Sequence, residues 1–142
     1  MKLHKSGVGK IFYKLQTVAY RLTGGALGGV TSGVPTLLLT TTGRKSGRAR
    51  TTPLLYLEDG SDYVVVASSA AQPTHPAWWL NLEKNPDATI QIGSEKKAVR
   101  AAQADGNEKK RLWPRLTEIY EGFQVYQDNV KRDIPVVILT PV

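Results

Sequence analysis

The chain has 142 residues, a formal net charge of +7 and no cysteine. Its length predicts one domain with a core of its own, and the lack of cysteine excludes a disulfide framework, thiolate metal sites and a cysteine nucleophile. The excess of basic residues indicates an acidic partner: nucleic acid, an anionic lipid surface or a phosphorylated small molecule.

Residues 8–22 predict a helix, since apolar residues recur there at helical spacing: Ile11, Leu15, Val18, Ala19 and Leu22. The favoured interpretation packs this apolar stripe on a sheet, and the alternative lays the basic helix on an anionic membrane. The glycines between residues 24 and 33 follow a helix and not a strand, which excludes a dinucleotide fingerprint. No apolar run reaches the roughly 20 residues that span a bilayer, and no signal peptide is recognisable. We therefore expect a cytoplasmic protein with at most peripheral membrane contact.

A basic hairpin is expected next, with strands at 35–42 and 51–57. Four cations fall within seven residues of its loop: Arg44, Lys45, Arg48 and Arg50. Glycines in the loop allow backbone N–H groups to face an anion, and arginine offers a planar fork for phosphate or carboxylate. One solvated basic turn would be unremarkable, but like charges at this density favour an anionic partner, so we predict a phosphate-binding loop. Pro53 predicts an edge position or a bulge in the second strand.

Residues 62–68 predict a strand that is buried on both faces, followed by small residues that let a ligand approach the backbone. Residues 76–84 predict a short helix with Pro76 at its first position. Its Trp78 and Trp79 are expected in the core or in a wall that flanks a planar ring. His75 is expected to cap or to hydrogen-bond, with catalysis the less favoured role. Because His4 is the one other histidine, no metal site is expected.

The remaining pattern predicts strands at 88–92, 98–104 and 134–139, and a helix at 107–120 that Pro114 kinks or divides. Tyr120, Phe123 and Tyr126 are spaced to share one side of a helix, where they either pack on the barrel or form a pocket wall. About six strands in meander order, with helices outside them, predict an antiparallel barrel of the α+β class.

Several segments together resemble the deazaflavin-dependent nitroreductase family: residues 41–54, 66–69, 75–82, 112–114, 120–127 and 132–136. The resemblance covers about residues 34–142, which leaves 1–33 as an N-terminal helix and glycine-rich connection within a single-domain chain. It implies a split β-barrel like that of FMN-binding oxidoreductases, and it implies the deazaflavin coenzyme F420, whose reduced form is the hydride donor.

The family's site carries over by position. The resemblance implies that the coenzyme's phosphate and acidic tail contact the basic loop. It implies that the ring contacts the backbone after the third strand and the tryptophan helix. The coenzyme residues implied in this way are Arg44, Lys45, Ser46, Arg50, Pro53, Ser68, Ser69, Ala70, Ala71, His75, Trp78 and Trp79. The substrate side falls on Tyr56, Ser68, Tyr120 and Tyr126. Two positions depart from the family: residues 69–71 read Ser-Ala-Ala where many members have Lys-Gly-Gly, and Phe123 replaces a common tyrosine.

This resemblance implies a reductase that passes a hydride to an electron-poor enone, unsaturated ester or lactone, quinone or nitro compound. A tyrosine hydroxyl, with Tyr126 favoured, would stabilise or protonate the developing negative charge. Two alternatives remain: an FMN-binding oxidoreductase or flavin carrier on the same barrel, and a non-enzymatic basic module for nucleic acid or anionic lipid. Cations that converge on one cleft favour an enzyme, whereas cations spread along an exposed face favour the module.

Overall fold

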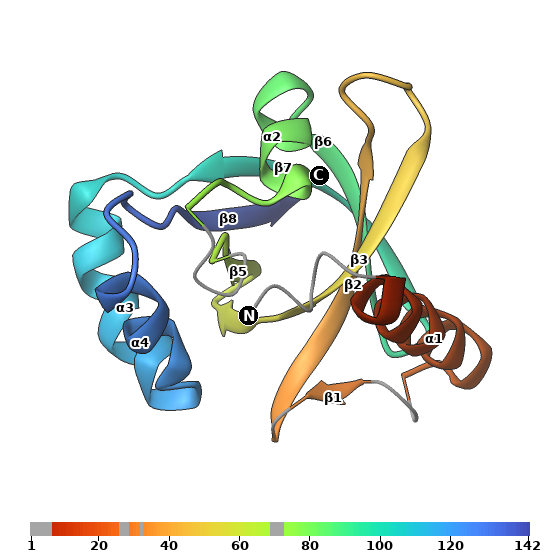
Figure 1. The fold of residues 1–142 in the computed structure, drawn as a ribbon, viewed down its shortest axis with the longest axis horizontal. Helices are drawn as coiled ribbons and strands as arrows, with labels where there is room; N and C mark the ends of the chain where they lie inside the picture. Colours follow the sequence, from red (N-terminus) through yellow and green to blue (C-terminus); the bar gives the residue numbers. More distant parts are fainter. Residues whose placement is uncertain (1–6, 26–28, 32, 69–72) are drawn as a thin grey trace.

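A computed structural model describes residues 7–25, 29–31, 33–68 and 73–142 (Figure 1). Within these residues the chain forms helices and antiparallel strands, as the α+β prediction requires: α1 (Gly7–Thr23), β1 (Val30–Thr31), β2 (Val34–Thr42), β3 (Ala49–Leu55), β4 (Leu57–Asp59), β5 (Asp62–Val66), α2 (Ala77–Lys84), β6 (Asp87–Ile92), β7 (Glu95–Gln103), α3 (Gly106–Ile119), α4 (Gly122–Asp128) and β8 (Val136–Pro141). The strands beyond the predicted six are the short β1 and β4.

The strands form one curled sheet in the order β1-β2-β6-β7-β8-β5-β4, with β3 paired to β2 (Figure 1). The predicted meander order is therefore wrong. Hairpins such as β6–β7 are local, but β6 also pairs with β2, and β8 lies between β7 and β5. The strands β6 and β8 thus each have one neighbour from a distant part of the sequence, β2 and β5 respectively.

Prolines account for two differences at element boundaries. Pro76 is the residue before α2, in an extended conformation, and not the first helical residue. The helix α3 is continuous through Pro114, so the predicted division is wrong. Pro114 lies on the exposed side, while Leu112 and Leu116 are buried on either side of it and hold both halves of the helix in place. A reciprocal cap between Asp105 and Glu108, at 2.8 and 3.1 Å, begins this helix.

Alternate residues of β5 and β8 belong to two separate core clusters. Val65 and Leu139 pack with the two tryptophans of α2 inside the curl of the sheet. Val64 and Ile138 pack with residues of α3 and α4, which lie beside the opposite face (Figure 1). Burial on both faces, as predicted for the third strand, is thus confirmed.

The helix α1 presents the opposite face to that expected. Leu15, Val18 and Leu22 are 65%, 45% and 81% exposed, so the expectation that this stripe packs on the sheet is wrong for them; the side chain of Ile11 lies outside the described residues. The buried anchor is Tyr20, whose hydroxyl donates to the Gln91 carbonyl oxygen at 3.1 Å and accepts from the Gly93 N–H at 2.9 Å. The end of the sheet beneath α1 has polar backbone groups, the Gln91 carbonyl and the Gly93 N–H. The helix therefore packs on the sheet with the face that carries Tyr20, which can hydrogen-bond to them. No helix in the described part of the chain is long and apolar enough to cross a membrane.

Candidate active site

The basic loop is built on a regular hairpin. The register of β2 and β3 is continuous from Thr42 opposite Ala49 to Thr36 opposite Leu55, so no bulge interrupts it at Pro53. Within the described residues β3 pairs with β2 alone, which confirms the edge position predicted from Pro53.

Residues 43–48 form a tight turn whose backbone is largely occupied. The Gly43 N–H donates to the Arg48 carbonyl at 2.8 Å, and the Gly47 N–H donates to the Gly43 carbonyl at 2.8 Å. Gly47 has a φ of 71°, which favours glycine. The Arg48 N–H donates to the Ser46 hydroxyl at 3.1 Å. Because these N–H groups are engaged within the protein, they are not available for the backbone cradle that the sequence suggested.

The loop is fixed to α2 through a buried amide. The Asn81 Oδ1 accepts from the backbone N–H of Arg44 at 3.0 Å and from Arg44 Nη1 at 3.2 Å. The Asn81 Nδ2 donates to the Thr41 hydroxyl at 3.1 Å. Lys84 Nζ, one turn further along α2, donates to the Arg44 carbonyl at 2.7 Å. Backbone and guanidinium of Arg44 are thus held in place before any ligand arrives.

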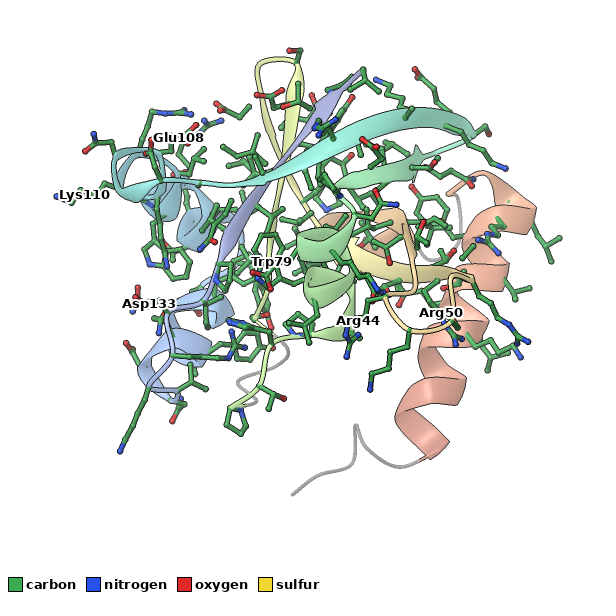
Figure 2. The ribbon with its side chains drawn as sticks, turned by 90° about the horizontal axis from the view of Figure 1, so that it is seen from above. Arg44, Arg50, Trp79, Glu108, Lys110 and Asp133 are labelled. Carbon is green, nitrogen blue, oxygen red and sulfur yellow. The ribbon has the colours of Figure 1, made fainter. Side chains whose placement is uncertain are left out.

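A cavity of about 720 Å³ lies between this hairpin and α2. Three predicted coenzyme cations line it, Arg44, Lys45 and Arg50, together with Ser46 and the largely buried Trp78. In Figure 2, Arg44 lies beside α2 and Arg50 lies on the side of the hairpin nearest α1. Small residues, Ala49 and Ala77, form part of the wall and leave room for a ligand. The cations therefore converge on one cavity.

The structure describes only some of the residues that are predicted to contact the coenzyme ring. Ser69, Ala70 and Ala71 lie outside the described residues. Ser68 and His75, on either side of them, are both joined to Arg132: its Nη2 donates to the Ser68 carbonyl at 2.9 Å, and its Nη1 lies 2.9 Å from His75 Nδ1. Trp79 is buried in the core cluster inside the sheet and does not line the cavity.

Two of the predicted substrate-side tyrosines meet. The hydroxyl oxygens of Tyr120 and Tyr126 are 3.0 Å apart, and the Tyr120 ring packs edge-on against Phe123 with centroids 5.0 Å apart. Tyr120 does not share a helix with the other two rings, because it lies in extended conformation between α3 and α4. The chain's reversal there brings the rings together.

The structure does not bring Tyr56 to this pair. Tyr56 packs edge-on against Tyr63, with centroids 6.0 Å apart, next to the core cluster inside the sheet, whereas Tyr120 and Tyr126 pack on the cluster under α3 and α4. Burial raises the pKa of the Tyr56 hydroxyl, and the carboxylate of Glu58 raises it further.

Sequence reasoning missed Asn81 and Arg132. A signal existed for Asn81, a lone amide within the apolar run of residues 78–82. Arg132 begins the family-like segment 132–136, but its contacts could not be predicted locally, because its partners lie 57 to 65 residues away in the sequence.

Residues 12–141 match a protein family described as F420H(2)-dependent quinone reductase. The chain belongs to this family. Among its relatives, Rv3178 of Mycobacterium tuberculosis, named as a candidate F420H(2)-dependent quinone reductase, is 48% identical over 76% of this chain and 91% of its own length. The F420H(2)-dependent quinone reductase Rv1261c of Mycobacterium tuberculosis is 39% identical over 94% of this chain and 92% of its own length. A solved structure of an F420-H2 dependent reductase, FDR-A, superimposes with a TM-score of 0.69 at 37% identity, over 74% of this chain and 93% of that one.

Membership confirms the resemblance, the split-barrel fold and the class of enzyme: the F420H(2)-dependent quinone reductase is an oxidoreductase whose hydride donor is reduced F420. The described residues fit such a coenzyme. Three cations suit an anionic phosphate and tail, and the small residues Ala49 and Ala77 leave room beside them.

Proposed function

We propose that this F420H(2)-dependent quinone reductase reduces a quinone, and that its coenzyme lies in the cavity between the basic hairpin and α2. The observation that carries the proposal is the convergence of Arg44, Lys45 and Arg50 on one cavity of about 720 Å³, which Trp78 also lines. A module for nucleic acid would instead spread its cations along an exposed face. The family name favours quinones over the enones, unsaturated esters or lactones and nitro compounds that the chemistry also allows.

In this proposal the residues of the chain bind the coenzyme and orient it. Arg44 is pre-ordered by Asn81 and holds the phosphate or tail carboxylates without a large ordering cost, while Lys45 and Arg50 add charge. The junction of Ser68 and His75 bounds the ring side. When bound, reduced F420 supplies a hydride to an electron-poor carbon of the substrate.

The hydroxyl pair of Tyr120 and Tyr126 is proposed as the source of the proton. One hydroxyl donates to the other across 3.0 Å, so the accepting oxygen still carries a hydrogen that it can give to a substrate oxygen. A reduced quinone builds negative charge on such an oxygen, and a fixed donor there acts mainly in the transition state.

A peripheral contact of α1 with an anionic membrane is also proposed. The exposed Leu15, Val18 and Leu22 lie at helical spacing, and the exposed cations Lys14 and Arg21 flank them. Quinones partition into lipid, so an enzyme that rests on the membrane surface would meet its substrate there.

The test is a titration of the purified protein with F420 and with FMN, followed by fluorescence, for the wild type, Arg50→Ala and Arg48→Ala. Arg48 is a matched control because it belongs to the same loop and does not line the cavity. Loss of one charge-assisted hydrogen bond, about 1.5–3 kcal/mol, weakens F420 binding about tenfold or more in Arg50→Ala. Equal affinity of the two variants would remove the loop from the coenzyme site, and tight FMN binding without F420 binding would overturn the proposed coenzyme.

A further inference from the structure

Arg132 contacts three groups that lie 57 to 65 residues before it in the sequence. Its Nη1 donates to the Ala67 carbonyl at 3.2 Å and reaches His75 Nδ1 at 2.9 Å, while Nη2 donates to the Ser68 carbonyl at 2.9 Å. Two of these partners are uncharged backbone carbonyls. Burial lowers the pKa of the Arg132 guanidinium, which nevertheless remains charged in proteins. These contacts connect the residues that follow β5 with His75, just before α2, and they place the Arg132 guanidinium beside two backbone carbonyls.

The contact with His75 determines which ring nitrogen carries the proton. A guanidinium has five donors and no acceptor, so the short contact is a hydrogen bond when His75 Nδ1 offers a lone pair. A neutral imidazole with a bare Nδ1 carries its hydrogen on Nε2. Arg132 therefore selects the Nε2–H tautomer of His75, and this nitrogen is a donor of fixed direction.

The same arginine is held from the side of the tyrosine pair. Gln127 of α4 donates through Nε2 to the Arg132 carbonyl at 2.9 Å, and its Oε1 accepts from the Ile134 N–H at 2.9 Å. These bonds fix the backbone of Arg132 relative to α4, which also carries Tyr126. Arg132 thus connects the helix of the proposed proton donor with the junction of Ser68 and His75.

We propose that Arg132 is a positioning residue of the coenzyme site: it fixes Ser68 and His75 relative to α4, so that His75 offers its Nε2–H as a donor to a polar edge of the deazaflavin ring. This inference rests on the proposed placement of the coenzyme. It assigns to Arg132 and His75 the orientation of the ring, while the basic loop holds the phosphate and tail.

The first arm of the test needs no coenzyme. Nitrogen-15 spectra of the histidine rings are recorded at about pH 8.5, where a free imidazole is neutral. The chain has two histidines, so His4→Gln assigns the signals of His75. We expect one tautomer, protonated at Nε2, in the wild type and in Lys131→Arg, and a mixture of tautomers in Arg132→Lys, whose single nitrogen cannot serve all three acceptors. A wild-type ring protonated at Nδ1 would overturn the inference.

The second arm measures binding of F420 and of a deazaflavin riboside that lacks the phosphate and tail. Arg132→Lys should weaken riboside binding about tenfold relative to the charge-matched control Lys131→Arg. His75→Asn keeps an acceptor near the position of Nδ1 and has no donor at that of Nε2, so it should lose riboside affinity similarly while keeping the melting temperature of the wild type.

The outcomes separate the inference from the proposed function. Wild-type riboside affinity in Arg132→Lys and His75→Asn, with F420 still bound tightly, overturns the inference alone. A wild-type protein that binds neither F420 nor the riboside overturns the proposed function and the ring contact with it, and the spectra of the first arm then still decide whether Arg132 fixes His75.

Discussion

Space for the tyrosine pair depends on the absence of a side chain at Gly122. A Cβ atom there would lie 2.5 Å from two ring carbons of Tyr120 and 2.7 Å from its hydroxyl oxygen. Glycine lets the chain enter α4 directly beneath the Tyr120 ring, which then meets Phe123 and Tyr126. Phe123 carries no hydroxyl, so the pair of Tyr120 and Tyr126 supplies the phenol groups of this cluster.

The substitution Tyr126→Phe tests the role of this pair. The substitution keeps the ring and its packing but removes one hydroxyl of the 3.0 Å pair. If the pair donates the proton, kcat for quinone reduction falls about tenfold or more while F420 affinity stays nearly constant. Steady-state rates and a separate F420 titration measure both quantities. Wild-type turnover in Tyr126→Phe would make Tyr126 a wall residue, with Tyr120 or solvent next to be tested.

Among the elements, α2 supports the basic loop through Asn81, which is almost fully buried. One amide oxygen serves both the backbone and the side chain of Arg44, and the amide nitrogen serves Thr41. Loss of this amide leaves the buried hydroxyl of Thr41, near the end of β2, and the backbone N–H of Arg44, in the loop, without this partner.

We therefore predict that Asn81→Leu, which keeps a similar volume, destabilises the fold by about 1–3 kcal/mol, the usual cost of an unsatisfied buried group. It should also weaken F420 binding, because Arg44 is no longer pre-ordered. Glu83→Gln, on the exposed side of α2, is the control. Chemical denaturation and F420 titration measure the two effects; an unchanged Kd in Asn81→Leu, with stability reduced, would limit Asn81 to a structural role.

A second contact between elements joins the β4–β5 hairpin to α3. The carboxylate of Asp59 accepts from Arg111 at 2.8 and 3.0 Å and from Arg115 at 2.8 Å. The two guanidinium groups hold the pKa of the Asp59 carboxyl well below its usual range. A carboxyl group with a lowered pKa stabilises the folded state where it is ionised.

This contact predicts a pH-dependent difference between the wild type and Asp59→Asn. The stabilisation is fully present above the pKa of an unfolded aspartate, about 4, and is lost as the pH falls below it toward the lowered pKa of the folded state. The melting temperature of the wild type should exceed that of Asp59→Asn at pH 7, and the two should converge in acid. A difference that stays constant from pH 7 to acid would show that Asp59 contributes through packing and not through its charge.

At the scale of the whole molecule, α1 has one face that packs on the sheet and one apolar face that is exposed. Tyr20 is buried and bonded to the turn between β6 and β7, whereas Leu15, Val18 and Leu22 point to solvent. The net charge of +7 adds attraction to any anionic surface.

The prediction for α1 is binding to vesicles that contain anionic lipid. Burial of a leucine or valine side chain contributes about 1.5–3 kcal/mol, so Leu15→Glu and Leu22→Glu should each reduce co-sedimentation several-fold without a change in melting temperature. Neutral phosphatidylcholine vesicles are the control for the charge contribution. Equal sedimentation of the wild type and both variants with anionic vesicles would contradict a membrane role for this stripe.

The sequence by itself determined the types of the elements, the basic loop and the family. These features are local: alternation and apolar runs identify strands, Pro53 identifies an edge, and the motifs between residues 41 and 136 lie in short segments. It also located the residues that the structure gathers around one cavity, Arg44, Lys45, Arg50 and Trp78, because hairpin and helix each carry their own signals.

Only the tertiary structure decided which distant segments meet. The insertion of β8 between β7 and β5, the separation of Tyr56 from Tyr120 and Tyr126, and the outward face of α1 depend on partners that no local pattern specifies. Arg132 is the clearest case, because its guanidinium contacts a histidine 57 residues away in the sequence. Helical periodicity gives the direction of an apolar stripe, but the polar groups of the surface beneath decide which face of the helix is buried.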